Sequence, residues 1–296
     1  PVTALSAGLV LYVIYLFGAQ VFGRGAAMFA AVAYALLPRP FYHGHLNCFD
    51  VPTTLMWLMC TWAYWRSLKS VRWGIATGAL WGIALLVKFT AMFLPIVFVT
   101  HFVILRWRDF RRSAQPAGLS VPAVPWAFVA MAVLGPLMFV GLWPWLWFDT
   151  IKRLGDYVGF MWHHPFYNMA YFGVTYFRPP FPISYPFGMT LATWPVTTLL
   201  LAIAGLAGSA WARLPVRLQG LGKPGDDRAT LLLLFLGFFF PYLVIALPSS
   251  PIFGGTKHFL HGMPFLAMFA GAAFAVLARA ARSSLPRFAH RTTAIS

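Results

Sequence analysis

The sequence contains no glutamate, and its six acidic residues are all aspartates. Charged residues make up only 9% of the 296 positions, whereas an ordinary soluble domain has about 25%. Hydrophobic residues account for 60% of the chain. This shortage of charge excludes a soluble globular protein and indicates a membrane protein. Because an acidic side chain is costly to place near a bilayer, the position of each aspartate carries information about function.

Cysteine is scarce as well. Cys48 and Cys60 would lie roughly 18 Å apart along a helix axis, but a disulfide needs Cα atoms within about 7 Å. These two cysteines are therefore expected not to pair. The sequence also lacks CxxC pairs and the Cys/His spacings of common zinc motifs.

Apolar segments close to the ~20 residues needed to cross a bilayer recur along the whole chain. We distinguish about nine, at residues 3–22, 25–38, 52–65, 73–87, 89–105, 123–147, 189–211, 230–247 and 263–280. The fourth and fifth form one stretch that would be ~50 Å long as a single helix, so it is expected to cross twice and turn near Lys88. The sequence predicts an all-α polytopic membrane protein with about nine visible transmembrane helices, forming one multi-spanning domain over residues 1–296.

The basic residues divide unequally between the two sides of this topology. Sixteen of the 22 fall in loops on one side, which the positive-inside rule places in the cytoplasm. The other six lie on the outer face: Arg39, Lys88, Lys152, Arg153, Arg178 and Lys257. The net charge of +16 therefore reflects topology, and no nucleic-acid binding is expected, because no basic stretch alternates with aromatic residues in a solvated domain.

Three loops on the predicted outer face carry the reactive side chains. Residues 39–52 (RPFYHGHLNCFDVP) include Asp50, residues 148–188 form a long aromatic loop, and residues 248–262 contain GGTKHFLHG. Within the long loop, residues 150–162 have an amphipathic helical pattern and are expected to lie at the membrane interface. The aromatic residues could equally form a belt of membrane anchors. Asp50 could simply cap the helix that begins near Pro52, a role compatible with a function.

This inventory suits group transfer from a lipid-linked phosphate donor. A polyprenyl phosphate is an acceptable leaving group, so the site needs Lys or Arg, with or without a metal, to hold the phosphate charge. One carboxylate suffices to activate an acceptor. Besides Asp50, the expected substrate-binding residues are Arg39, His43, His45, Lys88, His163, His164, Tyr167, Arg178, Lys257 and His258.

Three segments, in this order, resemble membrane glycosyltransferases with the GT-C fold, of the protein O-mannosyltransferase and lipid A aminoarabinose transferase branch. Residues 22–57 (FGRGAAMFAAVAYALLPRPFYHGHLNCFDVPTTLMW) resemble the family's small-residue-rich helix, its aromatic and basic loop, and the Asp that heads the next helix. Residues 81–95 (WGIALLVKFTAMFLP) and residues 253–264 (FGGTKHFLHGMP) are similar to its Gly-rich helix and its late outer loop.

The resemblance implies inverting transfer of a sugar from a polyprenyl-phosphate donor to a protein, lipid or glycan. The reaction would take place at the outer or periplasmic face of a bacterial inner membrane. Asp50 matches the family's second acidic position, which orients the donor phosphate or a bound divalent cation, Mg²⁺ or Mn²⁺. The family's main base lies in a first outer loop, which together with a first helix is expected upstream of Pro1.

Other functions remain open at this point. Lys88 could mark a helix break in a transporter of a small or lipid-linked solute, and an inactive scaffold subunit is a further possibility. A metal hydrolase built on His43, His45, His163 and His164 is weaker, because such pairs occur often by chance. Lys88 and Lys257 could also reach toward lipid phosphates from the ends of helices.

Overall fold

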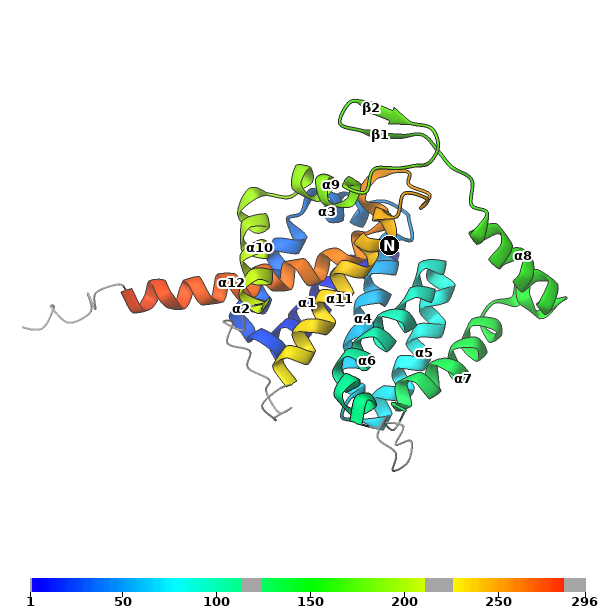
Figure 1. Cartoon of the computed structure of the whole chain (residues 1–296), viewed down its shortest axis with the longest axis horizontal. Helices are drawn as coiled ribbons and strands as arrows, with labels where there is room; N and C mark the ends of the chain where they lie inside the picture. Colours follow the sequence, from blue (N-terminus) through cyan, green and yellow to red (C-terminus); the bar gives the residue numbers. More distant parts are fainter. Residues whose placement is uncertain (1, 113–123, 211–225, 285–296) are drawn as a thin grey trace, which may run out of the picture.

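The computed structural model describes residues 2–112, 124–210 and 226–284, which form twelve α-helices, four 3-10 helices and one β-hairpin (Figure 1). The helices of the first half are α1 (Val2–Phe22), α2 (Arg24–Ala35), α3 (Pro38–Gly44), α4 (Asp50–Ser67), α5 (Val71–Val87), η1 (Phe89–Phe93), α6 (Leu94–Arg112), α7 (Trp126–Gly141) and η2 (Pro144–Trp147). Then follow α8 (Thr150–Trp162), β1 (Met169–Tyr171), β2 (Val174–Tyr176), α9 (Tyr185–Thr193), α10 (Val196–Ala210), α11 (Asp226–Ala246), η3 (Gly255–His258), η4 (Leu260–Gly262) and α12 (Met263–Ser284).

Each of the nine predicted apolar segments contains a helix, and the all-α prediction is confirmed. Four helical stretches are long and apolar enough to span a membrane: residues 2–22, 89–106, 228–246 and 260–282. Three shorter apolar helices cover residues 71–87, 126–141 and 196–210. The protein is therefore an integral membrane protein, although fewer than nine of the described helices reach spanning length by themselves.

One predicted segment, residues 189–211, is divided into two helices. α9 ends at Thr193, the next residue, Trp194, has an extended backbone (φ −90°, ψ 143°), and α10 begins after Pro195. Proline has no backbone N–H and disfavours helical geometry in the residue before it. The break therefore follows directly from Pro195.

The chain folds back near Lys88, as the length of the 73–105 stretch predicts. Lys88 is extended (φ −160°, ψ 136°) between α5 and η1. The indole of Trp81 donates a hydrogen bond to the carbonyl of Ala91 at 2.8 Å. In a straight helix these residues would lie about 15 Å apart along the axis. Lys88 therefore occupies the connection between two short helices.

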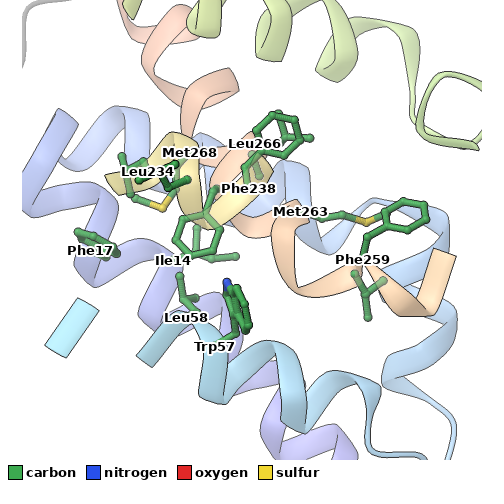
Figure 2. Packing of buried hydrophobic residues seen from close by; sticks show 14 of the residues in the cluster. Ile14, Phe17, Trp57, Leu58, Leu234, Phe238, Phe259, Met263, Leu266 and Met268 are labelled. Carbon is green, nitrogen blue, oxygen red and sulfur yellow. The ribbon is translucent and has the colours of Figure 1, made fainter. Parts of the chain in front are cut away.

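The core lies where α1, α4, α11 and α12 meet. Figure 2 shows Ile14 and Phe17 of α1, Trp57 and Leu58 of α4, and Phe238 of α11 packed around the start of α12. Trp57 is 1% exposed, and its indole donates a hydrogen bond to the carbonyl of Gly237. This packing holds the first turn of α4, and with it Asp50, in a fixed place relative to the end of the bundle.

Small residues allow other helices to approach closely. Gly78 of α5 faces the backbone of Ala130 of α7, and Gly271 of α12 faces the backbone of Ala26 of α2. In a membrane, helices associate through such close van der Waals packing, because lipid is as apolar as the side chains. Adding a methyl group at these glycines would push the helices apart.

The three loops predicted on the outer face come together at one end of the helical bundle, where α3 and α9 lie (Figure 1). The amide of Phe181 in the long loop donates a hydrogen bond to the carbonyl of Pro248 in the last loop. The hydroxyl of Thr3 in α1 donates to the carbonyl of Cys48 in the first loop. The loops therefore lie at the same end of the bundle, and their place on the outer face of the membrane stays a prediction.

The amphipathic helix predicted at residues 150–162 is α8, with the same bounds. None of its residues is buried, and Ile151, Val158 and Trp162 are exposed. Tyr157 contacts Phe89, which follows the Lys88 turn, with ring centroids 5.4 Å apart. The exposed apolar face agrees with a place at the membrane interface, which stays a prediction.

We expect Gly78→Ala to lower the free energy of unfolding by about 1–3 kcal/mol, because a methyl group there meets the backbone of Ala130. Gly8→Ala in α1 is the matched control, since no atom lies within 4 Å of its added methyl group. Thermal unfolding in detergent measures both variants. Equal stability of the two would contradict close packing of α5 on α7.

The loop arrangement predicts which positions share a side of the membrane. In a Cys48→Ser background, where the remaining Cys60 is fully buried, a cysteine placed at the exposed Ser184 or Ser249 should react with an impermeant thiol reagent added to whole cells. A cysteine at Ser70, at the opposite end of α4, should react only after the cells are permeabilised. If Ser184 and Ser249 label from different sides, the loops do not share one side of the membrane. If both label from one side but the order of accessibility is reversed, only the predicted orientation is wrong.

Candidate functional site

Asp50 is the first residue of α4 and is only 6% exposed. Its Oδ1 atom accepts a hydrogen bond from Nζ of Lys88 at 3.0 Å. Its Oδ2 atom lies 3.4 Å from Nδ1 of His43. Three predicted site residues, taken from α3, α4 and the α5–η1 turn, are therefore in direct contact.

The interpretation of Asp50 as a helix cap is wrong. Phe49 is the N-cap residue of α4, and no side-chain cap bond is formed there among the described residues. The Asp50 carboxylate is bound to Lys88 and His43 instead. Its negative charge in the first turn still favours the helix through the macrodipole.

The charge state of Asp50 follows from opposing effects. Burial alone would raise the pKa of this carboxyl group. The hydrogen bond with His43 and the positive charge of Lys88 outweigh burial and hold the pKa well below its ordinary value. Asp50 is therefore ionised at neutral pH and is a weak proton acceptor.

Lys88 is held by two neighbours in the first loop. Besides its bond to Asp50, its ammonium group lies 5.0 Å from the ring centroid of Phe49. The Lys88 side chain is 16% exposed. Lys88 thus points into the site, which favours a role there over anchoring to lipid phosphates.

A second group of predicted residues gathers around Phe253 in the last loop. We call Phe253, His164, Tyr167, Lys257 and His258 the Phe253 cluster. The ring of Phe253 stacks on His164 (centroids 5.4 Å apart), contacts Tyr167 (4.9 Å), and lies 4.1 Å from the ammonium group of Lys257. His258 donates a hydrogen bond through Nε2 to the carbonyl of Phe253, at 2.6 Å. The long loop and the last loop therefore build this cluster together.

Electrostatic interactions connect the two groups. Burial lowers the pKa of Lys257, the negative charge of Asp50 raises it, and the positive charge of Lys88 lowers it again. Burial and then Lys88 lower the pKa of His258 to about 4, so its imidazole is neutral at pH 7. The fixed cations that face Asp50 are thus lysines, and they outnumber the carboxylate. Such an excess of positive charge suits an anionic ligand.

The remaining predicted residues do not join these groups. His45 is exposed and bonds through Nδ1 to the Phe41 carbonyl, and His163 is exposed and lies near the carbonyl of Gly159 in its own helix. Arg178 is exposed in the long loop. Arg39 is half-buried at α3, near Tyr185 where α9 begins.

Sequence reasoning missed three residues that shape the site: Phe49, Phe253 and Gly254. Both phenylalanines lie next to or near predicted site residues within the quoted motifs, and this proximity in sequence could have identified them. Gly254 has a positive φ of 66°, and a Cβ there would lie 2.8 Å from Nζ of Lys257. Glycine adopts this left-handed conformation without strain and leaves room for the end of the Lys257 side chain.

The side chains beside Asp50 decide which metal could bind. His43, Cys48 and Asp50 each offer one ligand atom, and these atoms lie within 4.8 Å of one another. Mg²⁺ and Mn²⁺ prefer oxygen ligands, but this group supplies one oxygen, one nitrogen and one sulfur. The set therefore fits the expected Mg²⁺ or Mn²⁺ poorly.

Comparisons with known proteins find one matching family and two similar solved structures. Residues 2–145 match the family described as dolichyl-phosphate-mannose-protein mannosyltransferase. ArnT from Cupriavidus metallidurans in the apo state is similar with a TM-score of 0.63 at 17% identity, over 95% of this chain and 46% of that chain. The same protein bound to undecaprenyl phosphate gives a TM-score of 0.59 at 17% identity, over 98% and 51%.

The chain thus spans about half the length of these solved relatives. A comparison with curated proteins found no match. The family match covers Asp50 and Lys88, and the structural match covers 95% of the chain. The resemblance seen in the three sequence segments therefore agrees with both comparisons: residues 2–145, just under half of the chain, match the dolichyl-phosphate-mannose-protein mannosyltransferase family, and the chain has the ArnT-like membrane fold.

Proposed function

We propose that the protein transfers a sugar, with inversion, from a polyprenyl-phosphate donor to an acceptor at the outer or periplasmic face of the membrane. The observation that carries this proposal is the Asp50–Lys88 pair, which is largely shielded from solvent. Lys257 interacts electrostatically with both of these charges. The pair lies where the three predicted outer loops meet, and it falls within the segment that matches the family. A polyprenyl-phosphate partner is further supported by the similar ArnT bound to undecaprenyl phosphate.

The lysines have the role of phosphate ligands. As the bond between sugar and phosphate breaks, negative charge grows on the departing phosphate. Fixed cations at the right place stabilise that charge without reorganising. Lys88 is placed by Asp50 and Phe49, and Lys257 is placed by Phe253. The site therefore meets the main electrostatic requirement of the reaction.

Asp50 acts in this proposal as a positioning residue and not as the base. Both of its oxygens have partners, and its pKa is held low by them. An effective general base has a pKa near the working pH and can reach the acceptor proton. Asp50 meets neither condition, so its role is to hold Lys88 at the donor phosphate.

A transporter or an inactive scaffold is less well supported. Lys88 does lie at a helix break, but it is paired with Asp50, and the loops that carry the site residues lie at one end of the bundle (Figure 1). The family match also favours an enzyme. A radiolabelled polyprenyl-phosphate sugar separates the three: an enzyme consumes it, a transporter moves a solute unchanged, and a scaffold does neither.

We expect Asp50→Asn to lower sugar transfer at least about 100-fold, while the protein still inserts into the membrane. Asn has the same shape but no charge, so Lys88 loses the counter-charge that orients it. Transfer of radiolabelled sugar in membranes measures the effect. Asp156→Asn, on the exposed face of α8, is the matched control and should retain activity. Wild-type turnover by Asp50→Asn would rule out the positioning role.

The two lysines should differ in importance. Lys88→Gln is expected to lose about 10²–10³ in rate, because it removes a contact to developing charge. Lys257→Gln should lose less, since Lys257 contacts the ring of Phe253 and not Asp50 directly. Initial rates at low donor concentration measure both variants, with Lys152→Gln on α8 as the exposed control. If Lys88→Gln keeps more than about half of the wild-type rate, Lys88 does not bind the phosphate.

A further inference from the structure

We infer that His43, Cys48 and Asp50 form a binding site for a thiophilic divalent cation, with zinc as the metal that fits best. The site combines an imidazole, a thiol and a carboxylate, contributed by the end of α3, the following loop and the start of α4. Zinc accepts all three ligand types, and three protein ligands leave a fourth position open. Metal binding is measured without any sugar donor, so this inference stands apart from the proposed transfer.

The distances agree with tetrahedral coordination. With ordinary zinc–ligand bonds, the imidazole nitrogen and the carboxylate oxygen should be about 3.4 Å apart, and the nitrogen and the sulfur about 3.6 Å. In the structure, His43 Nδ1 lies 3.4 Å from Asp50 Oδ2 and 3.9 Å from Cys48 Sγ. All three atoms lie within 4.8 Å of one another, so a small movement of the cysteine side chain brings them to the distances of tetrahedral coordination.

The surroundings hold the ligands in place. Lys88 occupies Oδ1 of Asp50, which leaves Oδ2 directed toward His43 and the metal position. Ligating carboxylates are commonly fixed by such an outer hydrogen bond. The Cys48 carbonyl is tied to α1 by the hydroxyl of Thr3. The site therefore needs little ordering when the metal binds.

Charge and access also permit binding. The thiol of Cys48 loses its proton on coordination, so thiolate and carboxylate together balance the two positive charges of zinc. Lys88 then faces a neutral complex and is not repelled by an excess of charge. His43 and Asp50 are buried, but Cys48 is half-buried and gives the ion a path from the loop side.

The test uses the purified full chain in detergent, titrated with zinc against a chromogenic chelator and, separately, with Co²⁺. We expect a single equivalent to bind, with a thiolate-to-cobalt charge-transfer band and release of a proton. Losing even an outer-shell partner costs about 10–100-fold in affinity, so Cys48→Ser and His43→Ala should each weaken zinc binding at least that much. Mg²⁺ should not compete.

Two matched controls lie in the same chain. Cys60→Ser removes the only other cysteine, which is fully buried within α4, and His45→Ala removes the exposed histidine two residues from His43. Neither should change zinc affinity. In the wild type, zinc but not Mg²⁺ should slow alkylation of Cys48, read by mass spectrometry. Absence of the charge-transfer band, equal losses in the controls, or unprotected Cys48 would overturn the inference.

Discussion

The ion pair between Asp50 and Lys88 is the contact on which the rest of the site depends. It joins the first turn of α4 to the break between α5 and η1, across 38 residues of sequence. Both side chains are largely shielded from solvent. A charge in such a place is costly unless it is paired, so each residue requires the other. Phe49, His43 and Lys257 are therefore arranged around this one ion pair.

Much of the scaffold could be predicted, because length and apolarity act locally. The break at Lys88 followed from a simple conflict between a ~50 Å helix and a ~30 Å hydrocarbon core. The amphipathic pattern of residues 150–162 likewise gave α8 with its observed bounds. Pro195 is a local signal for a helix break, but it lies within a continuous apolar segment, so a single helix was predicted there. The strands β1 and β2 have only three residues each, which is too short for a recognisable alternation in the sequence, so the hairpin was not predicted.

The partners within the site could not be predicted, because they come from separate helices. From residue type alone, all four histidines of these loops (His43, His45, His163 and His164) were candidates for substrate binding. The structure turns His43 inward against Asp50, whereas His45, two residues later, points out and bonds to its own helix. Similarly, His164 stacks on Phe253 while His163 stays exposed. Which histidine faces the site depends on how α3 and the long loop pack, and residue type does not encode that.

The two oxygens of Asp50 have different partners, and because both belong to one carboxylate, binding at one oxygen affects binding at the other. Oδ1 faces Lys88 and the proposed phosphate position, and Oδ2 faces His43 and the proposed metal position. A zinc ion brings two positive charges and displaces the proton of Cys48, so its binding raises the net charge beside Lys88 by one. More positive charge strengthens the attraction for a departing phosphate, and an anion bound there would in turn favour the metal. The two ligands would therefore bind more tightly together than separately, through one carboxylate.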